Sequence, residues 1–288
     1  MANPSGGKMT LAADAPIDLQ LHTVHSDGAW TPEALIDHLL QEGFGAAAIT
    51  DHDRVDIVPV LQQVAQEKGF LLIPAVEMSA HWHDGNEPVD MLCFGFDQNP
   101  GPLRAVADDL LHRQQENIRQ VVRAIAEQGY PLPEDEVQNI IEQPSVQQPH
   151  SLVQLAKDQG YHSEERSAGR LLLNAGLEIT TVEIGRVVEA AHQCGGICLI
   201  AHPGRGDGYV KFDEALLDEL RTETPIDGFE VYYPRHSPEQ IEMYKAYAAK
   251  HNLFTSAGSD SHAPEKPPIK YEAGLSRKLL ERLGVQVL

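Results

Sequence analysis

The chain has 288 residues, 42% of them hydrophobic, and a formal net charge of −21. This size and composition are typical of a globular protein with one large or two smaller domains. The negative charge disfavours long duplex nucleic acid and anionic membranes as partners, although bound cations can reverse the field inside one cleft. No apolar run approaches the ~20 residues that cross a bilayer, and the N-terminus has no secretion signal. We therefore expect a cytoplasmic protein, with residues 1–15 flexible.

Strand and helix signals alternate at the start of the chain. Thr31-Pro32-Glu33 combines an N-cap residue, a proline suited to the first helical turn and an acidic side chain, and so predicts a helix start. Alternating strands and helices of this kind are typical of βαβ units, which form a parallel sheet or barrel. The expected elements are a strand over 17–21, a helix from 31 to about 42, a strand over 46–50, a helix through 60–65 that stops at Gly69, and a strand over 70–76.

The alternation breaks at His81. Residues 81–96 favour a hairpin-like excursion that contains a strand over 89–96. A long helix is then expected over about 103–128. Proline-rich turns and short amphipathic helices follow to about Gly176, without a strong strand signal. We therefore predict a helical insertion over residues 100–178.

The strand and helix alternation resumes at Thr181. A helix is expected to end near Gly195, and it is followed by a strand over 197–201. Two further strands are expected over 228–232 and 253–257, separated by a helix.

Histidine and acidic side chains stand at or just after the carboxyl ends of these predicted strands. In parallel α/β folds these ends meet on one rim, where active sites lie. Imidazole and carboxylate groups together suit Zn²⁺, Mn²⁺ or Fe ions. The sequence therefore predicts a multinuclear metal site on that rim. The residues concerned are His22, Asp27, Asp51, His52, Glu77, His202, Asp260 and His262.

Other catalytic motifs are absent from the sequence. There is no G-x-S-x-G nucleophile elbow and no G-x-x-x-x-G-K-[ST] phosphate loop. Gly204-x-Gly206-x-Gly208 lacks the spacing of a dinucleotide-binding loop, and we expect it to be a flexible loop. Covalent catalysis by a nucleophile elbow and nucleotide binding by a phosphate loop or a dinucleotide-binding loop are therefore disfavoured.

The strand-end residues fall in short segments that resemble the motifs of the PHP family, the polymerase and histidinol phosphatase superfamily. The resemblance covers nearly the whole chain from about residue 17. Residues 228–240 (GFEVYYPRHSPEQ) resemble in particular the stand-alone phosphoesterases that act on nucleoside 3′,5′-bisphosphates and on the 5′ ends of short RNAs. The motif segments are 18–28 (DLQLHTVHSDG), 49–53 (ITDHD), 76–77 (VE), 201–205 (AHPGR) and 258–262 (GSDSH).

The resemblance implies an α/β fold, a distorted (β/α)7 barrel of PHP type formed by residues 16–99 and 179–288. The helical insertion over 100–178 would be a substrate-capping domain. The rim would hold two or three divalent ions, Mn²⁺, Zn²⁺ or Fe²⁺, with Mg²⁺ as a further candidate. The implied ligands are His22, Glu77 and Asp260 for the first ion, Glu77 as a bridge with His202 for the second, and Asp27, His52 and His262 for the third.

Three positions depart from the family pattern. Gln20 stands where the first motif has a histidine, and a neutral amide is a poorer ligand than imidazole for Zn²⁺ or Mn²⁺. Asp90 stands where a histidine of the second ion is expected, and its added charge favours a harder ion. His81 and His83 are alternatives to Asp90. Residues 148–150 read Gln-Pro-His where the family carries Arg-Thr-His, so His150 remains as a candidate phosphate contact without the arginine.

These residues lead to a hypothesis of metal-assisted hydrolysis of a small phosphate monoester of a nucleotide. Glu77 and the ions would activate a hydroxide that attacks phosphorus. Arg205 and Arg235 would neutralise the phosphate oxygens. His236 or His202 would protonate the leaving alkoxide, and His236 would also contact substrate.

Two alternatives keep the same residues. One is a degenerate PHP domain that binds phosphate or metal without efficient catalysis. The other is an amidohydrolase that cleaves a C–N bond. The oligomeric state is not predicted by the sequence.

Overall fold

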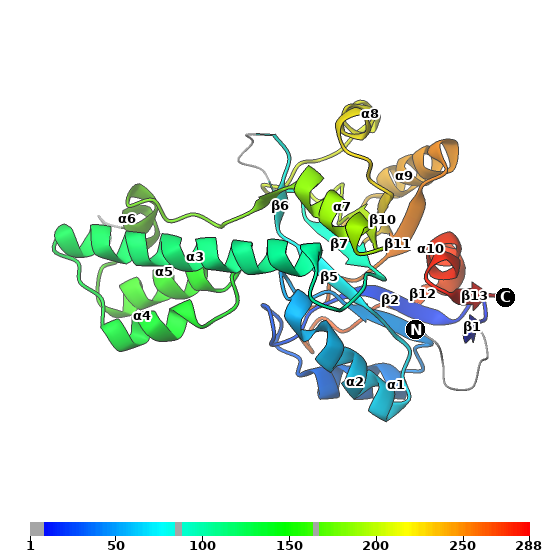
Figure 1. Cartoon of the computed structure of the whole chain (residues 1–288), viewed down its shortest axis with the longest axis horizontal. Helices are drawn as coiled ribbons and strands as arrows, with labels where there is room; N and C mark the ends of the chain where they lie inside the picture. The colour runs from blue at the N-terminus through cyan, green and yellow to red at the C-terminus, as the bar shows by residue number, and fades with distance from the viewer. Residues whose placement is uncertain (1–8, 84–87, 164–166) are drawn as a thin grey trace.

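The computed structural model describes residues 9–83, 88–163 and 167–288 (Figure 1). Helices and strands alternate through most of the chain, and the predicted α/β class is confirmed. The elements are β1 (Met9–Leu11), β2 (Pro16–Leu21), α1 (Pro32–Gln41), β3 (Ala46–Ile49), η1 (Val55–Ile57), α2 (Val58–Lys68), β4 (Leu72–Ile73), β5 (Ala75–Met78), β6 (Ala80–His81), β7 (Met91–Phe94), α3 (Pro102–Glu127), α4 (Glu134–Ile141), α5 (Gln148–Asp158), α6 (Ala168–Asn174), β8 (Val182–Glu183), α7 (Ile184–Gln193), β9 (Ile197–Ile200), α8 (Glu214–Glu223), β10 (Gly228–Tyr232), α9 (Pro238–His251), β11 (Phe254–Ala257), β12 (Tyr271–Glu272), η2 (Ala273–Ser276), α10 (Arg277–Arg282) and β13 (Val285–Val287).

Two larger sheets form the centre of the molecule. One has four strands in the order β12-β2-β3-β4, and the other has five in the order β11-β10-β9-β7-β5. Neighbouring strands are parallel except at β12 and at β7, which is antiparallel to both β5 and β9. β7 follows β5 without a crossover helix, which is typical of antiparallel pairing. The expectation of a parallel sheet is therefore met except at these strands.

The edge strands β11 and β5 of the five-stranded sheet meet the inner strands β2 and β3 of the other sheet at the carboxyl ends of the strands. Leu21 bridges to Ser261, and His52 bridges to Glu77. The backbone N–H of His22 donates to the carbonyl of Ser261 at 3.0 Å. Within the described ranges, the ladders do not form an unbroken ring around the molecule. The bridges nevertheless bring the ends of β2, β3, β5 and β11 to one rim.

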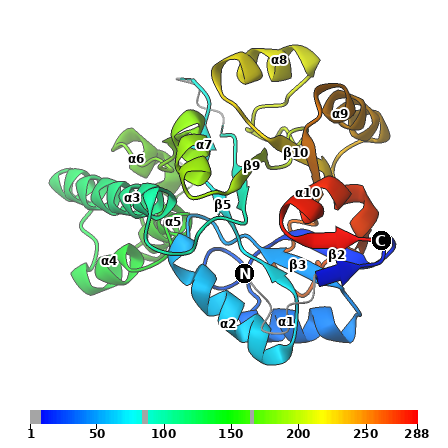
Figure 2. The same ribbon diagram turned by 45° about the vertical axis from the view of Figure 1, so that its right-hand side comes forward.

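Helices α1, α2, α7, α8, α9 and α10 surround the sheets (Figure 2). Apolar side chains fill the space between the sheets and beneath these helices. One buried cluster combines residues of β2, β3, β7 and β9 with residues of α10 and β13. A second lies between the first sheet and helices α1 and α2, and a third lies under α7, α8 and α9. Strands such as β3 and β9 are buried throughout. This explains why they appear in the sequence as continuous apolar runs rather than as alternating patterns.

Helices α3 to α6 project from the sheets to one side (Figure 1). The first half of α3 packs on the sheet region through Leu103 and Leu110. Its second half packs through Ile118 and Ile125 on α4, α5 and α6. α3 is 26 residues long and so belongs to both regions. No strand lies between β7 and β8 in the described part of this segment.

Several short elements differ from the sequence expectation. Residues 9–11, expected to be flexible, form β1 and pair in parallel with β13, while residues 1–8 lie outside the described ranges. The single strand expected over 70–76 is divided into β4 and β5 at Pro74, which has no N–H to donate to a ladder. Strands β6, β8 and β12 have two residues each, too few for a periodic signal. Among the described helices, none has the length and apolar character needed to cross a bilayer.

Candidate metal centre

Histidine and carboxylate side chains from separate strands converge on the rim. His22 follows β2, His52 follows β3, Glu77 lies in β5, and Asp90 immediately precedes β7. His202 follows β9, and Asp260 and His262 follow β11. The backbones of His202 and Asp260 have positive φ angles of 31° and 56°. Left-handed conformations at non-glycine residues cost on the order of 1 kcal/mol each and cluster at functional sites.

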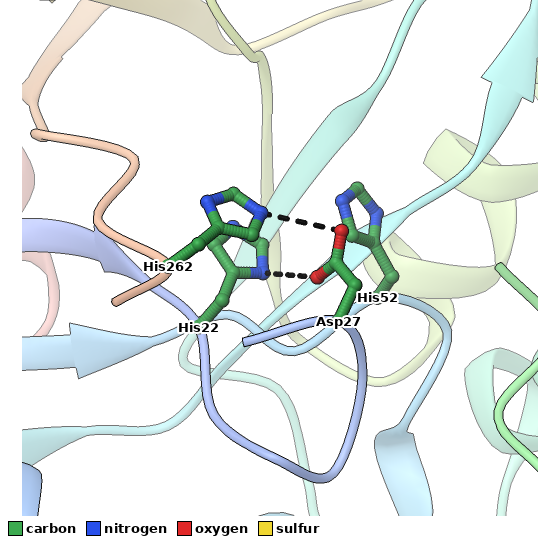
Figure 3. Close-up of side chains that lie close together, drawn as sticks. All are labelled: His22, Asp27, His52 and His262. Atoms are coloured by element: carbon green, nitrogen blue, oxygen red, sulfur yellow. Dashed lines mark ion pairs between the residues drawn. The ribbon is translucent and has the colours of Figure 1, made fainter. Parts of the chain in front are cut away.

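The first group on the rim consists of His22, Asp27, His52 and His262 (Figure 3). One ligand atom from each lies within 4.8 Å of the others. Asp27 Oδ2 is 3.3 Å from His262 Nε2, and Asp27 Oδ1 is 3.6 Å from His22 Nδ1. The rings of His22 and His262 stack with their centroids 4.1 Å apart. Asp27 therefore faces three imidazoles across a space of the size that a cation occupies.

Glu77 lies at the centre of two further groups. Its Oε2 is 3.1 Å from His22 Nε2, and its Oε1 is 3.2 Å from His202 Nε2. His22 Nε2 is also 3.2 Å from Asp260 Oδ1. The groups are His22, Glu77 and Asp260 on one side, and His52, Glu77 and Asp90 on the other. Because the two oxygens of Glu77 face different imidazoles, this side chain has the arrangement of a bridging carboxylate.

The charges of these groups compensate one another. Glu77 is fully buried, and burial alone would raise its pKa, but His52, His202 and His22 outweigh burial and hold the pKa well below its usual value. Burial and the neighbouring Glu77 raise the pKa of Asp90 to about 6. Burial of Glu77 as a carboxylate is tolerable because these three imidazoles stand beside it.

Unpaired buried polar atoms indicate what the centre can bind. Gln20 Oε1, His22 Nδ1, His52 Nδ1 and His202 Nδ1 are buried and have no hydrogen-bond partner. Such atoms cost free energy unless a ligand satisfies them. Imidazole and carboxylate donors together suit divalent transition-metal ions. The residues present therefore fit divalent metal ions.

The three positions that depart from the family pattern also lie at or near the rim. Gln20 is buried and donates from its amide to Glu77 Oε2 at 3.0 Å. Asp90 joins the group of His52 and Glu77, whereas His83 is exposed and pairs with Glu223. The neighbouring His81 bonds to Thr181 instead. Of the alternatives considered for this position, Asp90 is the one that lies within a ligand group on the rim, while His83 belongs to a separate, exposed group with Glu219 and Glu223.

Asp51 supports the rim without joining a ligand group. Its carboxylate accepts from the backbone N–H and the hydroxyl of Thr23, both at 2.6 Å, and from the hydroxyl of Ser26 at 2.7 Å. These bonds hold the loop that carries Asp27. The position of Asp51 at a strand end therefore reflects loop support rather than membership of the cluster.

Two cavities adjoin the metal centre, and Asp27, His52 and Tyr209 line both. The larger, about 930 Å³, is cationic on one side, where Arg205 and Arg235 line it. Arg205 is partly buried, with Nη1 3.9 Å from Asp260 Oδ2, while Arg235 is more exposed and pairs with Asp207.

The smaller cavity, about 490 Å³, lies beside the helical insertion. Gln147 and His150, at the start of α5, line it together with Ile179. The amide of Gln147 donates to the carbonyl of Ser26, and the hydroxyl of Ser145 donates to Asp53 at 2.9 Å. The insertion is thus tied to the loops of the rim, and His150 stands exposed at the cavity wall.

His236 does not have the geometry of a proton donor. Its Nδ1 bonds to the carbonyl of Val231 at 2.9 Å, and its Nε2 accepts from the backbone N–H of Gly204 at 3.1 Å. Both ring nitrogens are therefore engaged by backbone, and His236 lines neither cavity. The predicted roles in catalysis and substrate binding do not agree with this arrangement. His236 instead anchors the loop that follows β9.

Two tyrosines at the centre were not anticipated from the sequence. Tyr233 donates to Asp260 Oδ2 at 3.4 Å, and Tyr209 lines both cavities. Their rings lie 5.4 Å and 5.1 Å from that of His202. Tyr233 directly follows the strand 228–232, so a search of strand ends for hydroxyls as well as imidazoles would have found it. Tyr209 belongs to a loop and carries no comparable signal.

Comparison with known proteins identifies relatives over nearly the whole chain. A 5′-3′ exoribonuclease from Escherichia coli is 29% identical over 93% of this chain and 91% of its own length. A 3′,5′-nucleoside bisphosphate phosphatase from Chromobacterium violaceum is 28% identical, over 87% and 88%. A phosphoribosyl 1,2-cyclic phosphate 1,2-diphosphodiesterase from Eggerthella lenta is 25% identical, over 85% and 93%. All three names describe hydrolases of phosphate esters.

A similar fold is known from a solved structure. A protein from Bifidobacterium adolescentis, described as a metal-dependent phosphoesterase, superposes with a TM-score of 0.72 over 93% of this chain and 96% of its own, at 23% identity. The family model of the PHP domain matches residues 18–166, which is more than half of the chain. The chain therefore belongs to the PHP domain family.

Proposed function

We propose that this protein is a metal-dependent phosphoesterase that hydrolyses phosphate monoesters of nucleotides, either nucleoside 3′,5′-bisphosphates or the 5′ ends of short RNAs. The observation that carries the proposal is the position of Glu77, whose two oxygens face His22 and His202 beside a cavity lined by arginines. Relatives that act on nucleoside bisphosphates and RNA cover most of the chain and support the same substrate class.

The proposed metal ligands are drawn from the groups on the rim and from His202, which faces Glu77. His22, Glu77 and Asp260, with Gln20 beside them, would hold one ion, and Glu77 would bridge to a second ion held with Asp90 and His202. Asp27, His52 and His262 would hold a third. Two or three ions of Mn²⁺, Zn²⁺, Fe²⁺ or Mg²⁺ are the proposed cofactors. When bound, they would supply Lewis acidity and a water nucleophile of lowered pKa. The two sheets would then constitute the distorted (β/α)7 barrel of the family.

The protein side chains bind and orient the ester. Arg205 and Arg235 line the larger cavity and would pair with phosphate oxygens. Arg205 is the stronger candidate because Tyr209 and Asp260 already hold its guanidinium beside the centre. His202, which has an unpaired Nδ1, would act mainly as a ligand and is the remaining candidate for protonating the leaving oxygen.

The helical insertion would cap the substrate on the opposite side of the centre. His150 and Gln147 line the smaller cavity, and Ile179 gives it an exposed apolar wall. These groups suit the sugar and base of a nucleotide. A net charge of −21 disfavours a long nucleic acid outside the cavities, so the proposed substrates are small.

The test is elemental analysis of the full chain purified without chelator, together with phosphate release from a nucleoside 3′,5′-bisphosphate. We expect at least two ions per chain and phosphate release that chelation abolishes. Arg205→Ala should raise KM for the bisphosphate about 10-fold or more, because a charge-assisted bond is lost. Less than one ion per chain without phosphate release would support the degenerate domain. Release of ammonia from amide substrates instead would support the amidohydrolase.

A further inference from the structure

A short segment of the helical insertion reaches back to the rim. The connection between α4 and α5 ends in Ser145, Val146 and Gln147, and we call these three residues the strap. Val146 and Gln147 line the smaller cavity together with Asp27 and His52. The strap therefore shares the wall of this cavity with two side chains of one ligand group.

One end of the strap contacts the turn that carries His52. The hydroxyl of Ser145, which is buried, donates to Asp53 Oδ2 at 2.9 Å. Asp53 also accepts from the backbone N–H and the hydroxyl of Ser79 at 2.8 and 3.0 Å, and its own N–H donates to the carbonyl of Glu77 at 2.8 Å. Asp53 directly follows His52 and has a positive φ of 58°, which a non-glycine residue keeps only when its surroundings fix it. Ser145 is thus one of the groups that fix this turn.

The other end of the strap contacts the loop that carries Asp27. The side-chain amide of Gln147 donates to the carbonyl of Ser26. Ser26 is fully buried, and its hydroxyl lies 3.1 Å from Asp27 Oδ1. The same oxygen of Asp27 is 3.6 Å from His22 Nδ1. The position of Ser26 therefore affects how Asp27 faces the ligand group.

The strap bonds to the neighbours of two ligands that lie on different loops. An ion can bind Asp27 and His52 together only when the two loops keep a fixed separation. Arg54 joins the same loops through the carbonyl of His25 at 2.7 Å, but it lines neither cavity at the centre. The strap joins them on the side of the smaller cavity. By its contacts it belongs to the rim and not to the apolar interior of the insertion.

We propose that the strap positions Asp27 and His52, and that it determines how tightly their ligand group binds an ion. Ser145 and Gln147 are positioning residues, which act through the residues beside the ligands and do not touch the ion. Loss of groups that orient metal ligands typically lowers metal affinity. The inference rests on the metal centre of the proposed function, but it does not depend on the substrate.

The test is titration of the full chain with Mn²⁺ alone by calorimetry, after chelation has removed bound metal. Ser145→Ala removes a hydroxyl, and Gln147→Leu replaces an amide by an apolar group of similar size. Each change should weaken the binding of one ion about 5-fold or more, and the double variant should weaken it further. The ions held mainly by Glu77 should bind as they do in the parent chain.

Ser151→Ala and Gln115→Leu are the matched controls. The hydroxyl of Ser151 donates to Gln143 Oε1 at 2.6 Å, and the amide of Gln115 donates to the carbonyl of Ile141 at 3.0 Å. These changes remove the same kinds of hydrogen bond within the insertion, away from the rim. Neither should change the affinity for Mn²⁺. Urea unfolding of the metal-free variants measures any loss of stability separately.

Unchanged affinity for every ion in both strap variants would overturn the inference. An equal loss of affinity in the control variants would also overturn it, because the insertion would then act through its stability alone. If Ser145→Ala does not fold, Gln147→Leu, at a partly exposed position, carries the test by itself. Mn²⁺ binding that follows the expected pattern without phosphate release would overturn the proposed function and leave this inference intact. Phosphate release combined with unchanged Mn²⁺ binding in the strap variants would do the reverse.

Discussion

The rim of the sheets and the helical insertion bury opposite kinds of side chain. On the rim, His22, Glu77 and Asp90 are almost completely inaccessible. The cluster among α3 to α6, from Ile118 to Leu177, is made of apolar side chains, and the buried polar residues of this region, such as Gln114 and Gln148, are uncharged. The burial of charged side chains adds little to the stability of a fold, so such residues are kept where a reaction needs them. The burial of apolar side chains is the main stabilising contribution to folding. The comparison teaches that changes on the rim should alter reactivity, and changes in the insertion should alter stability or substrate affinity.

Glu77→Gln should have the largest effect. The amide keeps the size of the side chain but loses the charge that faces His22 and His202. We expect kcat/KM to fall by about 10³-fold or more, equivalent to about 4 kcal/mol of transition-state stabilisation. Bound metal should fall as well, while the circular dichroism spectrum is retained. Glu116→Gln, on the exposed face of α3, is the control. Undiminished turnover would show that Glu77 is not the bridge.

The positions of the strand ends on the rim could be predicted from the sequence, but the roles of the side chains at these ends could not. A strand buried on both faces is a continuous apolar run, so the ends at His22, His52 and His202 could be located from the sequence. Whether a side chain there binds an ion or supports a loop depends on the partners it meets. Asp51 stands at the same kind of position as His52 but bonds to Thr23.

The roles of other site residues could not be assigned, because they depend on contacts with backbone groups that lie far away in the sequence. His236 was expected to move a proton, and the carbonyl of Val231 and the N–H of Gly204 engage its ring instead. Tyr209 reaches the wall shared by the two cavities only through a left-handed turn over three residues. The helices of the insertion were predicted from their periodicity, but their contacts with the rim, such as Ser145 with Asp53, carry no sequence signal.

Asp18 offers a test of how the rim tolerates buried charge. It is fully buried and accepts from the backbone N–H groups of Ser259 and Ile269, both at 2.9 Å. Burial raises its pKa from 3.8 to about 7. Because the folded state holds the proton more tightly than the unfolded state, this group lowers stability as pH rises from about 4 through 7, by about 4 kcal/mol at most.

Asp18→Asn should remove this part of the pH dependence. Urea unfolding at pH values between 4 and 8 would measure it as a difference between the two proteins. The variant should gain stability relative to the parent as pH rises, with the change complete above about pH 7. Asp14→Asn, outside the buried core, is the control. A constant difference across this range would mean that Asp18 is already ionised at low pH in the folded protein.

Leu152→Ala, in the helical insertion, should lower stability and leave the metal centre unchanged. Leu152 is fully buried among α3 to α6, so truncation leaves a cavity and should lower the free energy of unfolding by about 3 kcal/mol. Metal content of the folded protein should not change. Urea unfolding and elemental analysis measure the two quantities, and Leu173→Ala, 64% exposed on α6, is the control. Loss of metal from the folded variant would contradict the proposal that the insertion affects stability or substrate affinity and the rim affects reactivity.

His150→Ala should have the smallest effect on activity. It is the most direct test of the difference between the rim and the insertion, because it asks whether the insertion contributes to substrate binding alone. His150 is exposed at the wall of the smaller cavity, outside the ligand groups. Loss of one polar contact with substrate should raise KM about 5-fold, with kcat changed less than about 2-fold. Steady-state phosphate release measures both, with His112→Ala on the exposed face of α3 as control. A fall in kcat at unchanged KM would place His150 in the chemistry, and the insertion would then share the function of the rim.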